Sequence, residues 1–146
     1  MAATGAAGFY EDMVGSYLTG KTFKALLAGE AYVFDKHTHK FRSSVTDEVT
    51  GTGYTAGGVE VLGVATQLDA ANSRVEITAG DVDFGQIDVT TSQLVVYIDT
   101  GSAATDRIVG VFDFPVQAPG GMNFTYRWND DDMNPGTPGV IGYINY

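Results

Sequence analysis

Hydrophobic and polar residues alternate most clearly near the C-terminal end of the chain. Residues 122–128, with the sequence MNFTYRW, place an apolar or aromatic side chain at every second position. Because successive side chains of a strand point to opposite faces of a sheet, this pattern predicts a half-buried strand. Residues 94–98, LVVYI, form an unbroken apolar run, which is typical of a strand buried on both faces. Both patterns predict a β-rich fold.

A helical period occurs near the N-terminus. Between residues 9 and 18 the apolar side chains recur at three- and four-residue intervals, with Glu11 and Asp12 on the opposite side. This predicts one short amphipathic helix, which Gly20 ends. After Gly20 the period returns to two. Further strands are predicted at residues 23–28, 31–34, 59–66 with a bulge at Gly63, 74–78, 81–84, 107–114 ended by Pro115, and 140–146.

About eight or nine short strands at this spacing predict an all-β fold. We expect an antiparallel β-sandwich of the jelly-roll type with one short N-terminal helix, and an immunoglobulin-like sandwich is the second choice. A parallel α/β fold is disfavoured because no helical pattern lies between the strands. The predicted organisation is an N-terminal arm and helix at residues 1–20, followed by a sandwich domain at residues 21–146.

The net charge of the chain restricts the classes of partner that it is expected to bind. The 146 residues carry a formal net charge of −10 and include no cysteine. This charge argues against direct binding to nucleic acid or to anionic membranes. It suits either solubility at high concentration or docking on a basic patch of a partner. No apolar run is long enough for a membrane span, and the first residues lack the basic and apolar regions of a secretion signal.

Residues 43–58, SSVTDEVTGTGYTAGG, combine glycines with one large side chain. Gly51, Gly53, Gly57 and Gly58 allow backbone conformations with positive φ, and Tyr54 is the one bulky group among them. We predict a folded structural loop that Tyr54 pins in place and that crosses between two sheets. The glycine spacing fits neither phosphate-binding motif, and no lysine follows, so nucleotide binding is rejected.

Two groups of residues are candidates for metal ligation. His37, His39 and Asp35 are spaced two apart and would share one face of a strand. A solvated polar loop is favoured instead, because the chain has only two histidines and Lys36 and Lys40 add positive charge nearby. Asp130, Asp132 and Asn134 occupy the first three ligand positions of an EF-hand loop; Pro135 and Ile141 break that motif, and only a looser Ca²⁺ site remains open. We predict no bound metal and no cofactor.

The sequence offers little for catalysis. It has no cysteine and no Gly-x-Ser-x-Gly elbow, and its two histidines lie in one short segment. A catalytic pair of carboxylates for glycoside cleavage is not excluded. The chain has 18 Asp and Glu residues, and their separation in space, which the sequence does not give, decides whether two of them can act together. We predict that the protein is not an enzyme.

The helix has more apolar groups than one packed face needs, and aromatic residues also end the chain. Tyrosine is enriched at subunit interfaces. We therefore expect an interface with a partner or a second copy at Phe9, Tyr10, Met13, Tyr17, Tyr143 and Tyr146.

An ordered series of segments resembles a family of small virion proteins of tailed bacteriophages. The series begins with DKHTHKF at residues 35–41 and DEVTGTGYTAGG at residues 47–58. It continues with LDA (68–70), AGDVDF (79–84), VVYIDTG (95–101), ATD (104–106), FDF (112–114) and FTYRWN (124–129). The resemblance thus covers roughly residues 22 to 129.

The resemblance implies a capsid decoration, or cement, protein. Such a protein would be made in the bacterial cytoplasm, bind the major capsid protein on the outer surface of the virion head, and associate with itself as a dimer or trimer. A tail or head–tail connector component is the alternative within the virion. A carbohydrate-binding module of the fibre type is the alternative from another class.

Overall fold

The computed structural model describes residues 5–128 and 139–146. These ranges contain the helix α1 (Ala7–Leu18), the 3-10 turn η1 (Arg42–Ser44) and nine strands. The strands are β1 (Thr22–Ala28), β2 (Val59–Glu60), β3 (Ala65–Asp69), β4 (Arg74–Ala79), β5 (Val82–Gln86), β6 (Thr91–Asp99), β7 (Arg107–Gln117), β8 (Asn123–Tyr126) and β9 (Gly139–Asn145). All their pairings are antiparallel. The predicted all-β sandwich with one short N-terminal helix is confirmed.

The chain divides into two compact units. The helix unit consists of Met1–Lys21, Leu62–Asp81 and Arg127–Tyr146, and the sandwich unit of Thr22–Val61 and Val82–Tyr126. Each unit is therefore built from segments that are far apart in the sequence. None of the helices in the described ranges is long and apolar enough to cross a membrane.

The helix unit is a three-stranded sheet, in the order β3-β4-β9, against which α1 packs through β3 and β4. Val14 is the buried residue of the helix. The helix ends as predicted: the Thr19 hydroxyl and N–H both donate to the Gly15 carbonyl, and Gly20 follows with a φ of 74°. A left-handed residue directly after the C-cap is a common helix stop, and glycine adopts it without strain.

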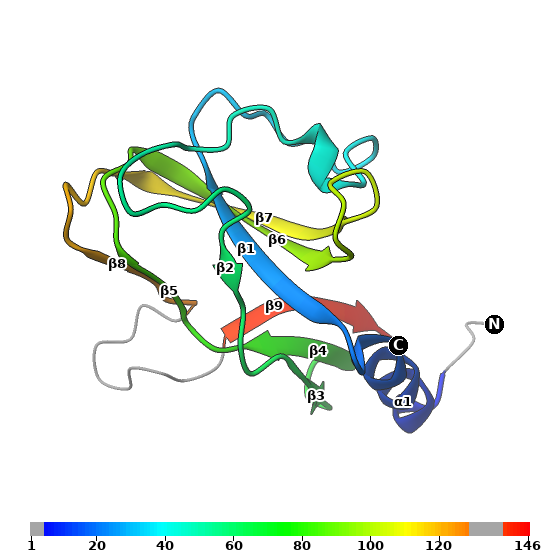
Figure 1. The fold of residues 1–146 in the computed structure, drawn as a ribbon. Helices are drawn as coiled ribbons and strands as arrows, with labels where there is room; N and C mark the ends of the chain where they lie inside the picture. Colours follow the sequence, from blue (N-terminus) through cyan, green and yellow to red (C-terminus); the bar gives the residue numbers. More distant parts are fainter. Residues whose placement is uncertain (1–4, 129–138) are drawn as a thin grey trace. The chain divides into compact units, whose positions relative to one another are not determined.

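The sandwich unit contains a four-stranded sheet, in the order β2-β1-β6-β7, and the two-stranded sheet β5-β8 (Figure 1). The two sheets are joined by aromatic packing, in which Phe114 of β7 contacts Phe124 and Tyr126 of β8. Strand β6 lies between β1 and β7, and residues 91–98 are all buried. The unbroken apolar run therefore forms a central strand, as predicted.

The other face of the four-stranded sheet is covered by a loop. Leu26, Val95 and Tyr97 form a buried cluster with Tyr32, against which Phe34 and Val45 pack. The predicted strand at residues 31–34 is wrong, because this segment turns at Gly29 and its aromatic rings cover the sheet. An aromatic-rich segment that shields a sheet looks like a strand in the sequence.

Two other predicted strand limits differ from the structure. The strand expected at residues 59–66 is divided into β2 and β3, because Gly63 adopts a φ of 69° and ends the pairing rather than forming a bulge within it. Strand β7 continues past Pro115 to Gln117. It is an edge strand, where a missing N–H need not remove a ladder hydrogen bond.

Candidate functional site

Helix α1 presents a row of exposed apolar side chains. Phe9, Met13 and Tyr17 are 65%, 46% and 56% exposed and follow one another at four-residue spacing. Residues four apart lie on the same side of a helix, so the three side chains form one stripe, here called the α1 stripe. Packing of α1 on its own sheet leaves these side chains in contact with solvent.

Strand β9 places further predicted interface residues in the same unit. Tyr146 stacks on Tyr10 with 6.0 Å between ring centroids, which ties the end of the chain to the helix. Tyr143 is exposed, and the guanidinium of Arg74 lies 4.8 Å from its ring centroid. All six residues predicted for an interface therefore belong to the helix unit, and Tyr10 and Tyr146 are half-buried against each other.

The Tyr54 hydroxyl anchors the glycine-rich loop to β1. It accepts a hydrogen bond from the Leu27 N–H at 3.0 Å and donates one to Glu48 Oε1 at 3.0 Å. Glu48 Oε1 also accepts from the Gly57 N–H at 2.5 Å, so one carboxylate holds both halves of the loop. The Tyr54 hydroxyl thus connects the loop to both β1 and Glu48.

Burial raises the pKa of the Tyr54 hydroxyl. The hydrogen bond from Leu27 acts in the opposite direction, and the negative charge of Glu48 adds to the increase. The hydroxyl therefore stays neutral at any physiological pH and remains the donor of the hydrogen bond to Glu48. A neutral phenol with fixed donor and acceptor directions is suited to structure rather than to proton transfer.

The loop glycines allow close backbone approach. Gly51 and Gly53 lie against the backbone at the end of β5 and just after it, where a Cβ would collide with the carbonyls of Asp88 and Gln86. Gly58 lies against β1 with a φ of 75°, and a Cβ there would collide with the Ala25 carbonyl. The Gly57 carbonyl accepts a hydrogen bond from the Tyr97 hydroxyl. The loop thus contacts both β1 and the segment between β5 and β6.

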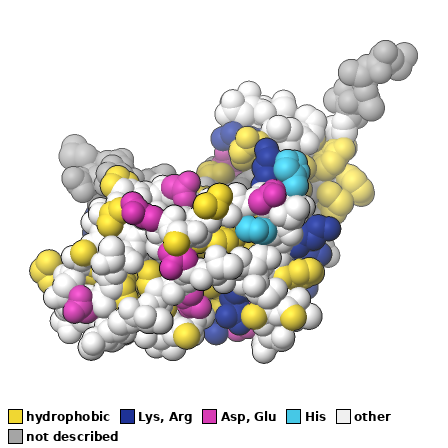
Figure 2. All heavy atoms as spheres, turned by 90° about the horizontal axis from the view of Figure 1, so that it is seen from above, with side chains coloured by type: hydrophobic (Ala, Val, Ile, Leu, Met, Phe, Trp, Pro, Cys, Tyr) yellow, Lys and Arg dark blue, Asp and Glu magenta, His cyan; other side chains and the backbone are white. Residues whose placement is uncertain are grey.

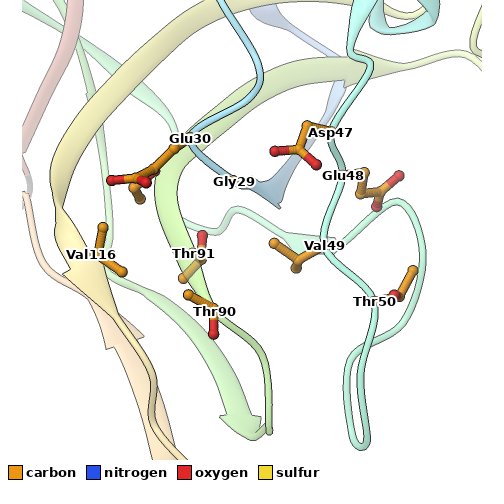
Figure 3. A pocket seen from close by; sticks show the side chains of 10 residues that line it. Gly29, Glu30, Asp47, Glu48, Val49, Thr50, Thr90, Thr91 and Val116 are labelled. Carbon is orange, nitrogen blue, oxygen red and sulfur yellow. The ribbon is translucent and has the colours of Figure 1, made fainter.

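A pocket of about 400 Å³ opens beside this loop, in the sandwich unit (Figure 3). Its walls come from the turn that follows β1, the first half of the loop, the start of β6 with the residue before it, and Val116 of β7. Glu30 and Asp47 contribute carboxylates, whereas Figure 3 shows that the Glu48 side chain points away toward the rest of its loop. Thr50, Thr90, Thr91 and Ser92 contribute hydroxyl groups.

The two histidines belong to the loop that covers the sheet. The Asp35 N–H donates to His39 Nδ1 at 3.3 Å, the Tyr32 hydroxyl lies 3.3 Å from the same nitrogen, and the two rings stack. Asp35 Oδ1 accepts from the His37 N–H at 2.8 Å, and Figure 2 shows both histidines at the surface near acidic and basic side chains. These contacts stabilise a turn.

The metal candidates are not assembled within the described residues. Among residues 5–128 and 139–146, no group of three or more His, Asp or Glu side chains is placed to hold an ion, and Asp35, His37 and His39 form no such group. The candidates Asp130, Asp132 and Asn134 lie outside these ranges.

Sequence reasoning missed two features of the sandwich unit. One is the ion pair of Arg42 with the buried Asp106, in which Arg42 Nε lies 2.7 Å from Asp106 Oδ2. The other is the acidic pocket, whose residues Glu30, Asp47 and Ser92 come from three separate segments. Neither has a local motif, because the partners meet only through strand pairing.

Comparison with family models, with curated proteins and with solved structures finds no match for the chain.

Proposed function

We propose that this chain is a structural protein of tailed-bacteriophage virions that binds the outer surface of the assembled head and stabilises the shell. The resemblance of its ordered segments to small virion proteins supports the class of function. The α1 stripe is the observation that carries the binding role, because Phe9, Met13 and Tyr17 remain exposed on a chain with a net charge of −10. Scattered single apolar residues are ordinary, but an aligned row of large ones is typical of a contact surface.

Three polar residues with well-defined hydrogen bonds stabilise the fold, which fits a structural protein. Asp106, Glu48 and Tyr54 are engaged with partners in the fold rather than directed into a common cleft. We therefore propose that the protein has no catalytic activity and needs no cofactor.

The stabilising mechanism is mass action. A ligand that binds the assembled lattice and not its dissociated subunits favours assembly by RT ln(1 + [L]/Kd) at each site. A homo-oligomer strengthens this effect, since each additional binding site acts at a high effective concentration once the first has bound. Acidic charge on an external protein also disfavours its binding to DNA, which is itself negatively charged.

Counting copies in purified virions tests the proposal. A decoration protein is expected at on the order of hundreds of copies per particle, as lattice symmetry demands, whereas a connector component is expected at about a dozen or fewer. The companion measurement is co-sedimentation of the purified chain with empty heads, at saturating ratio. Copy number at the connector level, or no binding to heads, would contradict the decoration role.

A test of glycan binding distinguishes a decoration protein from the remaining alternative, a carbohydrate-binding module. A carbohydrate-binding module of the fibre type would bind specific glycans on an array and would not sediment with heads. A decoration protein would give the opposite pair of results, so the two experiments together separate the classes.

A further inference from the structure

The pocket beside the glycine-rich loop presents negative charge and hydrogen-bond acceptors. Glu30 and Asp47 lie on either side of Gly29 (Figure 3). The hydroxyl-bearing residues Thr90 and Ser92 lie just before β6 and at its start. None of its ten lining residues is a lysine, an arginine or a histidine. An anionic ligand would meet like charge without compensation, so the chemistry of the pocket favours a cation.

The two carboxylates are not neutralised within the described residues. Asp47 Oδ2 accepts a single backbone hydrogen bond, from the Ala31 N–H at 3.0 Å. The Glu30 carboxylate makes no hydrogen bond or ion pair in that part of the chain, and the four ion pairs found there involve other residues. Both carboxylates therefore keep free acceptor positions beside the pocket.

Ser92 gives an independent indication of a ligand. Its residue is only 7% exposed, yet in the described part of the chain its hydroxyl makes no hydrogen bond. Its neighbour Thr91 instead donates to the Ala28 carbonyl at 3.0 Å. Among the described residues, every fully enclosed polar side-chain atom has a hydrogen-bond partner, so the unpaired Ser92 hydroxyl is not fully enclosed. The open space that Ser92 lines is this pocket. Polar side chains in largely buried residues normally have a hydrogen-bond partner, so the accessible hydroxyl of Ser92 is suited to a partner that enters the pocket.

The shape and lining distinguish between classes of cation. A metal ion is disfavoured, since among the described residues no group of three or more acidic or histidine side chains is placed to hold one. A sugar is disfavoured because no aromatic ring lines the pocket for stacking. The mainly polar walls also differ from the apolar lining of most small-molecule sites.

We propose that the pocket binds the guanidinium group of an arginine side chain presented by a protein partner, which under the proposed function is the head shell. A guanidinium carries five N–H donors in one plane, which matches a site that offers carboxylate and hydroxyl acceptors. Val49 and the exposed Val116 supply apolar surface for the aliphatic stem. The net charge of −10 favours association with a basic surface.

A titration with N-acetyl-arginine amide tests the pocket without any virion. The neutral isostere N-acetyl-citrulline amide is the control probe, and binding is followed through backbone amide chemical shifts. We expect saturable shifts at Thr90 and Ser92 with the arginine probe, weakened by added salt, and no such shifts with citrulline. Equal responses to the two probes, or shifts that lie elsewhere on the chain, would overturn the proposal.

Variants connect the pocket to the partner. Glu30→Gln and the double variant Glu30→Gln/Asp47→Asn remove pocket charge, while Glu60→Gln removes one charge from an exposed residue of β2 outside the pocket. We expect the double variant to bind heads about tenfold more weakly than the Glu60→Gln control, because it loses charge-assisted hydrogen bonds. Melting temperatures of all three proteins establish that they are folded.

The binding experiments distinguish an error in the arginine site from an error in the proposed decoration role. If the wild-type chain binds heads and the pocket variants bind equally well, the arginine site is overturned and the decoration role stands. If the arginine probe binds in the pocket but the wild-type chain does not bind heads, the site stands, and the head shell is excluded as the partner.

Discussion

Arg42 and Asp106 form an ion pair that joins η1 to the residue before β7, with the carboxylate buried and the guanidinium partly exposed. The Asp106 carboxylate is 0% exposed, and its Oδ2 lies 2.7 Å from Arg42 Nε. Its Oδ1 accepts from both the N–H and the hydroxyl of Thr100, and the Arg42 N–H donates to the Asp106 carbonyl at 2.8 Å. A buried charge is tolerated here because its acceptors are occupied.

Removal of this charge should destabilise the fold. Asp106→Asn leaves the partly exposed Arg42 without its counter-ion, and loss of a hydrogen bond to a charged group costs about 1.5–3 kcal/mol. Asp113→Asn is the matched control, since Asp113 is an exposed residue of β7. Denaturant titration of both variants measures the difference, and equal stability of the two would contradict the structural role of the pair.

The same pair predicts a dependence of stability on pH. Burial alone would raise the pKa of the Asp106 carboxyl, but hydrogen bonds from the Thr100 N–H, from Arg42 and from the Thr100 hydroxyl outweigh burial and lower it. A carboxyl with a lowered pKa in the folded state adds stability that is complete above the unfolded value of about 4 and is lost as pH falls through the folded value.

The stability difference between the wild type and Asp106→Asn isolates this effect from general charge repulsion. We expect the difference to be constant near neutral pH and to shrink as pH is lowered below about 4. Urea titrations at several pH values measure it. A difference that grows toward acidic pH would contradict the assignment.

Elements with a clear period could be predicted from the sequence. The helix that ends before Gly20 and the central strand β6 follow from local pattern, because burial of one face or both faces imposes a recognisable spacing. The segment at residues 31–34 has the same composition as a strand, yet Tyr32 and Phe34 cover the sheet from a loop. Local pattern records that a residue is buried, not which element buries it.

The candidate sites could be predicted only in part. Tyr54 stands out among glycines, so its role as a pin could be anticipated, but its partners Leu27 and Glu48 could not. Arg42 and Asp106 are separated by 64 residues, and no spacing rule relates them. Residues that meet through strand pairing leave no local signal, and the acidic pocket arises in the same way.

Tyr54 should contribute to stability through its hydroxyl as well as its ring. Tyr54→Phe leaves the N–H of the buried residue Leu27 unpaired, which costs about 1–3 kcal/mol. Tyr54→Ala also removes the ring that stacks on Phe84 and should cost about 3 kcal/mol or more. Chemical denaturation gives both values. If both variants keep wild-type stability while head binding is lost, Tyr54 belongs to a contact surface instead.

Gly58 should tolerate no side chain. Gly58→Ala combines a φ of 75° with a collision against the Ala25 carbonyl of β1, and we expect a loss of roughly 2–5 kcal/mol. Gly101→Ala is the matched control, because Gly101 has a φ of 92° with open space around it, and only the strain of about 1–2 kcal/mol applies. Thermal unfolding compares the two, and equal effects would show that close approach of the loop is unimportant.

The α1 stripe should matter for binding and not for folding. Phe9 and Met13 are exposed in the folded chain, so Phe9→Ser and Met13→Ser should leave the melting temperature nearly unchanged. An anchoring side chain that becomes fully desolvated in an interface contributes about 2 kcal/mol or more, so each variant should bind heads roughly 30-fold more weakly.

Two controls separate this effect from a general change of surface or of fold. Leu62→Ser removes an apolar side chain of the same unit that is 66% exposed and lies outside the helix, so head binding should be retained. Val14→Ser alters the buried residue of α1 and should lower the melting temperature, because a hydroxyl replaces packed methyl groups. Co-sedimentation with heads and thermal unfolding give the two readouts. If Phe9→Ser and Met13→Ser sediment with heads as fully as Leu62→Ser does, the stripe is not the contact, and the binding surface lies elsewhere on the chain.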